Sequence, residues 1–475
     1  MFFKTILQHA WVPGLLTLLG LSSAWSGEAR PDIFFYLADD QNYWDYGFAG
    51  NPTVETPNAD ALSKESLLFT RAYTSMAICA PSRSSLYTGL YPQGNGCYMN
   101  HIPSRIGTKS VAHYLQDLGY QVILAGKSHV KPDTVYEWSE YWPLERTENS
   151  KKGSLPLGKL RDFLKAKTGP VCVFMASDLP HGPYPSMSPI PEDEYHAMPH
   201  KSNTAGARKW AAGYYENIRR DDTQLGEVIK ILKASGSWDQ GVFFYAPDHG
   251  IDGKFTTYDR GLRVPLLMHW NGHAQAGVEL DQLVHFIDIV PTIVDIAGGE
   301  PLEGLDGKSL LPLLSGNVET LHEAVYGLQT CQNIQNTHIF PARCITTDRY
   351  KLTIQFNALE ALEKNSGENP IINEFLRMGA QKNRHRRLIE LYDLSEDPFE
   401  QNNLAGQPEF KAVRDKLVTR LLEWMHAQED FIELGKPLPL LKPNLHPLDK
   451  TTRFKDVPDH LEGKLKKSDY LPGHY

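Results

Sequence analysis

Short, almost entirely apolar segments recur along the chain, and polar residues follow most of them directly. The first covers residues 33–37 and leads into Asp39 and Asp40. Four similar segments lie at residues 120–125, 171–176, 241–246 and 264–269. A short run that is apolar on both faces is typical of a strand buried in a parallel sheet. We therefore expect a core of buried, mainly parallel strands.

Helical patterns separate these segments. They cover residues 110–118, 160–166, 205–234 and 288–297. Strands that alternate with helices indicate an α/β fold with helices on both faces of the sheet. The polar residues after the strands are Asp39-Asp40, Gly126 to His129, Asp178 to His181 and Asp248-His249. Because ligands gather at the carboxyl ends of parallel strands, we expect these side chains to converge on one rim.

The length of 475 residues suits two or three domains, or one large α/β domain with an appendage. We place the main α/β domain at residues 27–320. Expected strands at 325–329, 342–346 and 350–354, with a helix at 408–426, indicate a smaller α+β subdomain over residues 321–433. Residues 434–475 are rich in Pro and Lys with little periodicity, which predicts an irregular tail.

The N-terminus has the pattern of a cleaved export signal over residues 1–26. Lys4 precedes an apolar run at 11–21 and small residues at 22–26. The run is shorter than the roughly 20 residues that span a bilayer, and we expect no membrane span elsewhere. The chain has no Asn-x-Ser/Thr glycosylation acceptor with x other than Pro. This favours a bacterial periplasmic or secreted protein over a lysosomal one.

Composition excludes several classes of protein. Hydrophobic residues make up 41%, and 48 Lys+Arg against 57 Asp+Glu give a net charge of −9. This is a globular composition, unlike that of a disordered chain, a fibre or a polytopic membrane protein. The mild acidity predicts no nucleic-acid partner, and an anionic substrate would need a local cationic pocket. The basic cluster at 382–387 is interpreted as a surface loop, with a polyanion contact as the alternative.

The cysteine count is odd. Five cysteines in an exported chain leave at least one thiol for a separate role. Cys331 and Cys344 form the expected local disulfide, and the remaining connectivity is open. No CxxC zinc pattern is present.

The segment Cys79-Ala80-Pro81-Ser82-Arg83 matches C-x-P-S-R, and Leu-Tyr-Thr-Gly-Leu-Tyr-Pro follows at 86–92. It resembles the signature of the type I, formylglycine-dependent sulfatases. The resemblance implies an alkaline-phosphatase-like mixed sheet sandwiched by helices, with residues 27–320 as the catalytic domain. It also implies that a maturation enzyme oxidises Cys79 to formylglycine (3-oxoalanine). One hydroxyl of the hydrated aldehyde would attack sulfur and the other would expel sulfate. Arg83 would stabilise the alkoxide.

Asp39, Asp40 and Asp248 are hard carboxylate ligands at two expected strand ends. Two adjacent carboxylates after an apolar strand repel each other unless a cation lies there, which favours Ca²⁺, with Mg²⁺ possible in principle. The sulfatase resemblance implies a metal set of Asp39, Asp40, Cys79, Asp248 and His249. His249 stands where Asn is commoner in the family, so its place among the ligands is the open point.

Further cationic residues match family elements. Lys127 and His129 lie in Gly126-Lys127-Ser128-His129, which is similar to the family G-K-x-H element. The resemblance implies that Lys127 neutralises the sulfate oxygens and that His129 is the base that triggers sulfate elimination. His181 would assist the leaving group. Lys254 would contact the sulfate, with Arg260 as its rival.

Within the family the chain is most similar to heparan N-sulfatases (N-sulfoglucosamine sulfohydrolases) and their bacterial relatives. The mammalian enzyme of that group carries Asn where His249 stands and Arg where Lys254 stands. The segments that carry this likeness are residues 50–58, 126–136, 325–329 with 340–343, and 390–398 with 402–405.

The implied function is hydrolysis of sulfate esters or N-sulfo groups on a sulfated carbohydrate, with an N-sulfoglucosamine substrate first. The alternatives are an O-sulfatase for another glycan, such as an algal one, and a phosphonate or phosphodiester hydrolase of the same superfamily. A non-catalytic glycan binder is disfavoured because every motif residue is present. The pattern leaves the oligomeric state, the sugar and the sulfate position open.

Overall fold

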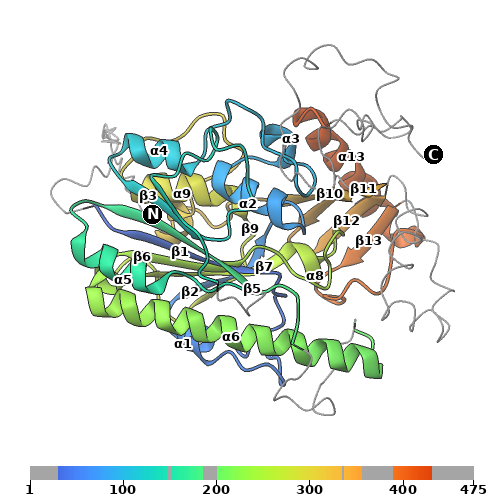
Figure 1. Cartoon of the computed structure of the whole chain (residues 1–475). Coiled ribbons are helices and arrows are strands. Elements are labelled where there is room, and N and C mark those ends of the chain that lie inside the picture. The colour runs from blue at the N-terminus through green and yellow to red at the C-terminus, as the bar shows by residue number, and fades with distance from the viewer. Residues whose placement is uncertain (1–29, 147–151, 186–200, 334–335, 356–388, 431–475) are drawn as a thin grey trace, which may run out of the picture.

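A computed structural model describes residues 30–146, 152–185, 201–333, 336–355 and 389–430. Two sheets organise these residues, a large one with helices on both faces and a smaller antiparallel one near the C-terminus (Figure 1). This confirms the expected α/β fold with a mixed sheet and a smaller C-terminal sheet. The exact domain limits at residues 320 and 433 stay predictions.

The large sheet has nine strands in the order β4-β3-β5-β1-β6-β7-β2-β8, with β9 paired to β2. Their bounds are β1 Ile33–Asp39, β2 Leu67–Tyr73, β3 Gln121–Gly126, β4 Glu140–Trp142, β5 Val171–Pro180, β6 Val242–Pro247, β7 Arg263–Trp270, β8 Glu279–Leu280 and β9 Val284–His285. The strands β4, β3, β5, β1 and β6 are parallel, so their carboxyl ends share one rim.

One sequence expectation about the large sheet is wrong. The segment at 264–269 was expected to be parallel like the others, but β7 runs antiparallel to both β6 and β2. Both faces of β7 are covered, so its apolar pattern carries no information about direction. Strand β2 and the short strands β4, β8 and β9 were also absent from the expectation.

Two helical layers cover the large sheet (Figure 1). One face packs against α2 Cys79–Thr88, α4 Val111–Asp117 and α9 Ile289–Ile296. The other packs against α1 Pro57–Glu65, α5 Leu157–Ala166 and the long α6 Ala205–Ser235. The shorter helices are α3 Pro92–Asn95, α7 Ser237–Gln240, α8 Asp259–Leu262, η2 Phe286–Asp288 and α10 Leu311–Leu314.

The second sheet has the order β10-β11-β12-β13 and is antiparallel throughout. Its strands are β10 Ala324–Asn333, β11 Asn336–Thr347, β12 Tyr350–Gln355 and β13 Ile389–Asp393. The helix α13 Lys411–Ala427, preceded by η4 Pro408–Phe410, packs on it through Leu417, Leu421 and Met425. Three strands and the helix agree with the sequence expectation, and β13 is additional.

A lysine joins the two sheets. Lys351 of β12 is fully buried and pairs with Asp259 of α8 at 2.6 Å and with Glu400 at 3.0 Å. Asp259 also accepts a hydrogen bond of 2.9 Å from Tyr73 of β2. Charged groups are buried at low cost only when they are paired in this way. The pairing therefore holds the segment before β7 against the C-terminal sheet.

The expected Cys331–Cys344 disulfide is wrong. Cys344 keeps a free, buried thiol, as do Cys79, Cys97 and Cys172. In the ladder between β10 and β11, Cys344 lies opposite Gly327 whereas Cys331 lies opposite Ile339. The strand register thus separates the two cysteines.

Three sequence interpretations lie outside the described residues. They concern the export signal at 1–26, the basic cluster at 382–387 and the tail at 434–475. Among the residues that the structure describes, no helix has the length and apolar character to cross a membrane.

Candidate active site

Three carboxylates meet where β1 and β6 end. Asp39 is the last residue of β1, Asp40 follows it, and Asp248 follows β6. Ala38 of β1 pairs with Pro247 of β6, and the Asp40 amide donates to Asp248 Oδ1 at 3.0 Å. All three side chains are buried. Successive side chains of a strand point to opposite faces, but Asp40 has φ 69°, and this turn brings both neighbouring carboxylates to the same site.

Cys79 is the first residue of α2 and points at this cluster. Its Sγ lies 3.6 Å from Asp40 Oδ1, 3.4 Å from His249 Nε2 and 3.7 Å from Lys254 Nζ. The backbone N–H groups at the start of a helix favour negative charge, so this position suits an anionic nucleophile.

Arg83 lies one helical turn after Cys79 and is fully buried. Its Nε donates to Asp248 Oδ2 at 3.0 Å, and Nη2 donates to Asp39 Oδ1 at 3.3 Å. A third bond of 3.4 Å runs to the backbone carbonyl of Lys127. Burial opposes the charge of Arg83, but Asp248 and Asp39 outweigh it and raise the pKa of the guanidinium. Arg83 therefore ties the ends of β1, β3 and β6 together.

Lys127 reaches the site from the end of β3. Its Nζ lies 2.5 Å from Asp39 Oδ2. The preceding Gly126 has φ 104°, and a Cβ there would come within 2.0 Å of the Ala176 carbonyl oxygen. Only glycine fits such a close approach between strands, so Gly126 permits the turn that aims Lys127.

Lys254 reaches the site from the segment between β6 and α8. Its Nζ contacts both oxygens of Asp40, at 2.9 and 2.6 Å. Asn42 holds this segment by accepting from the Asp252 amide at 2.9 Å and donating to Asp252 Oδ2 at 3.0 Å. Arg260, the rival for this role, lies instead with its guanidinium 4.7 Å from the centre of the Tyr258 ring. The structure thus places Lys254, and not Arg260, on the carboxylates.

These lysines keep the acids ionised. Burial opposes ionisation of Asp39, but Lys127, His181 and Arg83 hold its pKa well below the usual range. Lys254 and His249 do the same for the pKa of Asp40, again against burial. Burial also opposes the charge on the two lysines, yet Asp39 raises the pKa of Lys127 and Asp40 raises that of Lys254.

Two histidines contact Asp40. His249 is fully buried, with Nε2 at 3.0 Å from Asp40 Oδ1 and Nδ1 at 3.1 Å from the Gly250 carbonyl. His181 is 39% exposed, with Nε2 at 3.6 Å from Asp40 Oδ2 and Nδ1 at 2.7 Å from the Gly182 carbonyl. Asn217 of α6 donates to the carbonyls of Pro180, His181 and Pro183, which fixes the loop of His181.

His129 lies beside a histidine that sequence reasoning missed. His129 Nε2 is 3.2 Å from His101 Nδ1, and their ring centres are 5.0 Å apart. Burial, together with the nearby charges of Lys127 and His101, lowers the pKa of His129 well below its ordinary value. A neutral imidazole of this kind can accept a proton. His101 belongs to no motif and follows no strand, so the sequence carries no signal for it.

Ser82 is a second residue whose role sequence reasoning missed. Its hydroxyl donates to the Asp248 carbonyl at 2.5 Å and accepts from Thr74 at 2.7 Å. It lies inside the C-x-P-S-R motif, which was the available signal. Its contacts show that it joins α2 to the end of β6.

The donor set fits a divalent cation that prefers oxygen. One atom each of Asp40, Cys79 and His249 lie within 4.8 Å of one another, and so do atoms of Asp39, Cys79 and Asp248. Three buried carboxylates around one point match the hard ligands of Ca²⁺ or Mg²⁺. They face three cations, Arg83, Lys127 and Lys254, so a divalent ion would leave the site with net positive charge.

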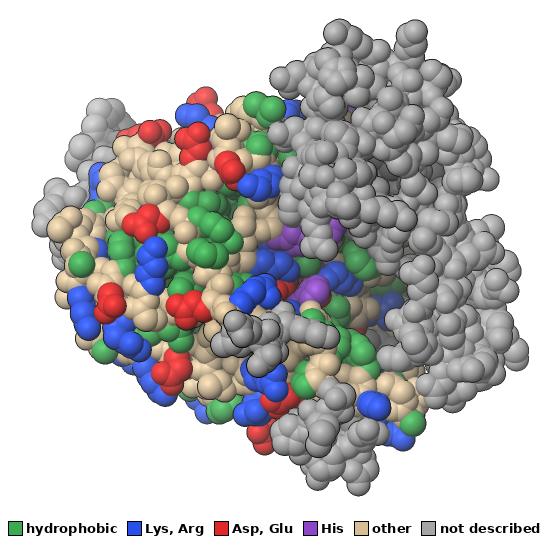
Figure 2. Space-filling view, viewed as in Figure 1, with side chains coloured by type: hydrophobic (Ala, Val, Ile, Leu, Met, Phe, Trp, Pro, Cys, Tyr) green, Lys and Arg blue, Asp and Glu red, His purple; other side chains and the backbone are tan. Residues whose placement is uncertain are grey.

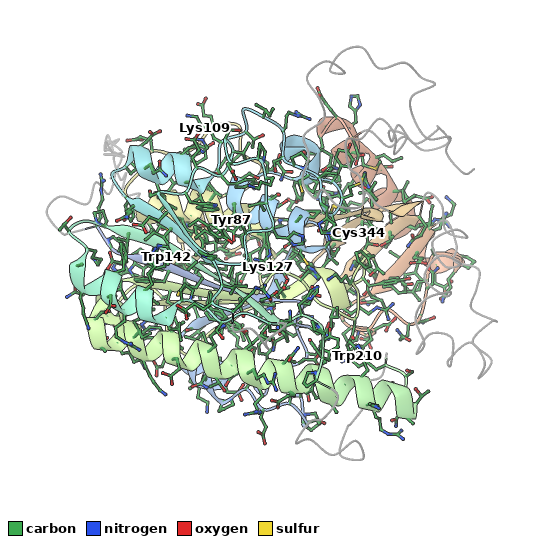
Figure 3. All side chains as sticks on the ribbon, in the orientation of Figure 1. Tyr87, Lys109, Lys127, Trp142, Trp210 and Cys344 are labelled. Carbon is green, nitrogen blue, oxygen red and sulfur yellow. The ribbon has the colours of Figure 1, made fainter. Side chains whose placement is uncertain are left out.

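The site opens at a hollow in the surface. Figure 2 shows Lys, Arg and His side chains gathered there, near the middle of the view. Figure 3 places Lys127 in the same central region, whereas Trp142 lies away from it on the side of α5. Basic side chains thus concentrate at the rim formed by the parallel strands.

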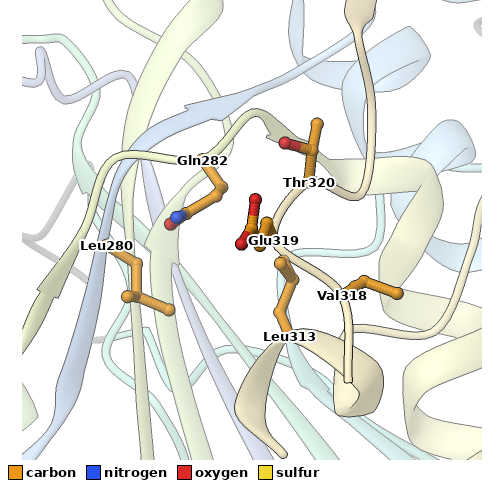
Figure 4. A pocket seen from close by; sticks show the side chains of 6 residues that line it. All are labelled: Leu280, Gln282, Leu313, Val318, Glu319 and Thr320. Carbon is orange, nitrogen blue, oxygen red and sulfur yellow. The ribbon is translucent and has the colours of Figure 1, made fainter. Parts of the chain in front are cut away.

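A second hollow lies at the far edge of the large sheet, beside β8 (Figure 4). Its lining is Leu280, Gln282, Leu313, Val318, Glu319 and Thr320. β8 is separated from β1 by β6, β7 and β2. The lining contains one charged side chain and none of the residues at the rim, so we assign it no part in the chemistry.

Two protein-family models match this chain. The sulfatase family model matches residues 31–299, and the model for the C-terminal part of N-sulphoglucosamine sulphohydrolase matches residues 247–366. The chain is 42% identical to an ulvan-active sulfatase of Formosa agariphila, covering 96% of this chain and 92% of that protein. It is 29% identical to the N-sulphoglucosamine sulphohydrolase of Homo sapiens, covering 88% and 93%.

Solved structures share the fold at low identity. One is a protein in complex with its substrate D-glucosamine-2-N,6-O-disulfate, with a TM-score of 0.67, 18% identity, and coverage of 86% of this chain and 100% of that chain. Another is a phosphonate monoester hydrolase of Agrobacterium radiobacter, with a TM-score of 0.67, 21% identity, and coverage of 84% and 96%. The family match over more than half of the chain and the relative at 42% identity are decisive: the chain belongs to the sulfatase family, whose enzymes are sulfate ester hydrolases.

Proposed function

We propose that this protein is an exported sulfatase that acts on a sulfated oligosaccharide or polysaccharide. The nucleophile is formylglycine made from Cys79 by a maturation enzyme. A divalent cation completes the site, with Ca²⁺ as the first candidate. The observation that supports this most is the position of Cys79. It starts α2 within 3.6 Å of Asp40 and 3.7 Å of the Lys254 ammonium.

The cations of the chain are arranged for a sulfuryl group. Arg83 and Lys127 pair with Asp39, and Lys254 pairs with Asp40 beside Cys79. Positive groups already held in a buried site stabilise the charge that develops on the transferred group without further reorganisation. The bound metal ion, held by Asp39, Asp40, Asp248, Cys79 and His249, would supply Lewis-acid polarisation.

Two histidines take the proton transfers. His129 is buried and neutral, which suits the base that removes a proton when sulfate is expelled. His181 is partly exposed at the mouth, with Nδ1 bonded to the Gly182 carbonyl and Nε2 3.6 Å from Asp40 Oδ2. In its protonated form, His181 can donate the Nε2 proton to the oxygen or nitrogen of the departing sugar.

The relatives name two substrate classes. The relative at 42% identity is called ulvan-active, which favours an O-sulfated algal polysaccharide. The relative at 29% identity is an N-sulphoglucosamine sulphohydrolase, and a C-terminal model of that name matches residues 247–366. We therefore put an algal O-sulfated glycan first and the N-sulfoglucosamine substrate second.

The central experiment is Cys79→Ala combined with mass analysis. Cys79 is almost fully buried and makes no strong bond, so Cys79→Ala should keep the fold while turnover on ulvan and heparin oligosaccharides disappears. The mature Cys79 peptide should weigh about 18 Da less than the cysteine form. Full activity of a protein that carries only the thiol would refute the proposal.

A matched pair of substrates distinguishes sulfate ester hydrolysis from the alternative function, phosphonate or phosphodiester hydrolysis. A sulfate monoester and a phosphonate monoester with the same leaving group should differ strongly in rate, with the sulfate ester faster. The structural likeness to a phosphonate monoester hydrolase concerns the fold alone, so a faster phosphonate reaction would assign the chain to that chemistry.

A further inference from the structure

A loop between β6 and β7 has a first limb at residues 250–254 and a second limb at 257–262, which lie backbone to backbone. The Gly250 amide donates to the Gly261 carbonyl at 2.9 Å. A Cβ on Gly253 would come within 2.3 Å of the Gly261 nitrogen, and a Cβ on Gly261 within 2.3 Å of the Gly253 carbonyl oxygen. Only glycine fits an approach this close, so the two limbs move together.

The first limb carries Lys254 to the active site. Its ammonium contacts both oxygens of Asp40, at 2.9 and 2.6 Å. The next amide, that of Phe255, donates at 3.1 Å to the carbonyl of Ala77, which lies two residues before Cys79. The loop therefore determines where the lysine stands relative to the nucleophile.

The second limb is fastened to the second sheet. The Asp259 amide donates to Glu400 Oε2 at 2.7 Å, and the Asp259 carboxylate pairs with Lys351 Nζ at 2.6 Å. Lys351 also pairs with Glu400 Oε1 at 3.0 Å, which closes a ring of three groups. The Thr257 hydroxyl lies 3.2 Å from that of Thr353 on β12. All five side chains are buried, and Figure 1 shows α8 beside the second sheet.

The two limbs are thus held from different sides. Asn42, close to the end of β1, holds Asp252 of the first limb through two hydrogen bonds. The bond from the Asp259 amide to Glu400 holds the second limb, and it is charge-assisted, which makes it one of the stronger kinds. A group that stabilises developing charge is most effective when it is held in place before the reaction. The placement of the Lys254 ammonium therefore depends on the second sheet as well as on β1.

We propose that the second sheet positions Lys254 for catalysis, with Glu400 and Thr353 as the positioning residues. They act through Asp259 and Thr257 on the second limb, and the glycine contact passes the constraint to the first limb. This inference rests on the proposed function, in which Lys254 contacts the sulfuryl group. It adds a role in catalysis for the C-terminal part of the chain.

The test is a double-mutant cycle between Glu400 and Lys254, with kcat and KM measured on nitrophenyl sulfate. Glu400→Ala removes the acceptor of the Asp259 amide and should lower kcat about 10-fold, because small displacements of a catalytic group are costly. Lys254→Ala should lower kcat about 10²-fold. In the Lys254→Ala background, Glu400→Ala should change kcat by less than about 2-fold, because the group that it positions is already gone.

Two further variants assign the effect to the proposed contacts. Glu400→Gln keeps a side-chain oxygen for the Asp259 amide and should recover most of the kcat that Glu400→Ala loses. Thr353→Val keeps the shape of the side chain but removes the hydroxyl that faces Thr257. It should cause a smaller loss of kcat that is again absent in the Lys254→Ala background. If Glu400→Ala does not fold, Thr353→Val supports the same cycle.

Asp393→Ala is the matched control. It removes a buried carboxylate of the same sheet, at the end of β13, which pairs with Arg349 and accepts from Ser395. This variant should hydrolyse nitrophenyl sulfate like the parent. A loss equal to that of Glu400→Ala would show that any damage to the second sheet lowers activity, and it would overturn the proposal.

The outcomes separate the two proposals. If the parent hydrolyses neither nitrophenyl sulfate nor a sulfated ulvan oligosaccharide, the proposed function itself fails. If the parent is active and Lys254→Ala is equally active, or if Glu400→Ala causes the same loss in both backgrounds, positioning by the second sheet is overturned. A crystal structure of Glu400→Ala gives a measurement without turnover. The Lys254 ammonium should lie about 1 Å or more from its place in the parent, and an unmoved ammonium would overturn the proposal.

Discussion

Replacing His181 by alanine tests the proposed chemistry most directly, because the structure separates its catalytic effect from its structural one. The imidazole is 39% exposed, and its bond to the Gly182 carbonyl is local. The loop backbone is held independently by three hydrogen bonds from Asn217. We therefore expect the stability of His181→Ala to stay within about 0.5 kcal/mol of the parent.

The kinetic effect should be large and should depend on the leaving group. Nδ1 donates to the Gly182 carbonyl, so the proton for the departing group comes from Nε2 of the protonated imidazole. General acid catalysis contributes typically 10²- to 10⁴-fold, or about 3–5 kcal/mol of barrier. A sugar hydroxyl is a poor leaving group and needs this proton, whereas a nitrophenolate leaves as the anion. The loss should therefore be about 10³-fold for a sugar sulfate and below about 10-fold for nitrophenyl sulfate.

The assay follows sulfate release from a sugar sulfate and nitrophenol release from the aryl ester, with kcat and KM separated for each. His273→Ala serves as the control, since His273 is exposed and follows the carboxyl end of β7. Because β7 runs antiparallel to β6, this end lies away from the active-site rim. Equal losses on the two substrates would refute the acid role and leave His181 with binding alone. An increase confined to KM would lead to the same conclusion.

Three further predictions concern the ion, the sheet junction and a core acid. Chelation should abolish activity and lower Tm, and Ca²⁺ should restore both, because an ion that binds the folded state and not the unfolded one stabilises the fold; unchanged Tm and activity after chelation would argue against a resident ion. Lys351→Met should lower the free energy of unfolding by about 3–5 kcal/mol in urea titrations, because it leaves Asp259 and Glu400 buried without their cation; a loss below 1 kcal/mol would contradict this. Burial raises the pKa of Asp221 to about 7, so the folded state holds a proton that the unfolded state releases near pH 4. The stability of the parent relative to Asp221→Asn should fall by up to about 3 kcal/mol from pH 4 to pH 7 and then level off, and a flat difference would refute it.

The sequence predicted that the polar side chains after the strands converge on one rim, because strand ends are encoded locally. An apolar run that stops at Asp39, Gly126 or Asp248 marks both a buried strand and its carboxyl end. Parallel pairing of β3, β5, β1 and β6 then brings those residues together without further information. The direction of β7 was missed because a strand covered on both faces looks the same in either orientation.

Other features depend on contacts between distant segments. His101 reaches His129 across 28 residues, and nothing around it in the sequence differs from an ordinary loop. Lys351 and Asp259 are 92 residues apart and meet only when the second sheet docks. The predicted Cys331–Cys344 disulfide was wrong for a related reason, since proximity in sequence does not determine the register of β10 against β11.

The electrostatics of the site explain how an acidic protein can take an anionic substrate. Asp39, Asp40 and Asp248 carry three negative charges and Arg83, Lys127 and Lys254 carry three positive ones, so these six side chains are neutral as a set, and each is paired as burial requires. A divalent ion would add the positive charge that the protein as a whole, at −9, does not provide. An ammonium has three donors, and the pairing of Lys127 with Asp39 uses one of them. Lys127 can therefore keep Asp39 ionised and still donate to a sulfate oxygen, so that it would act on the substrate together with the ion.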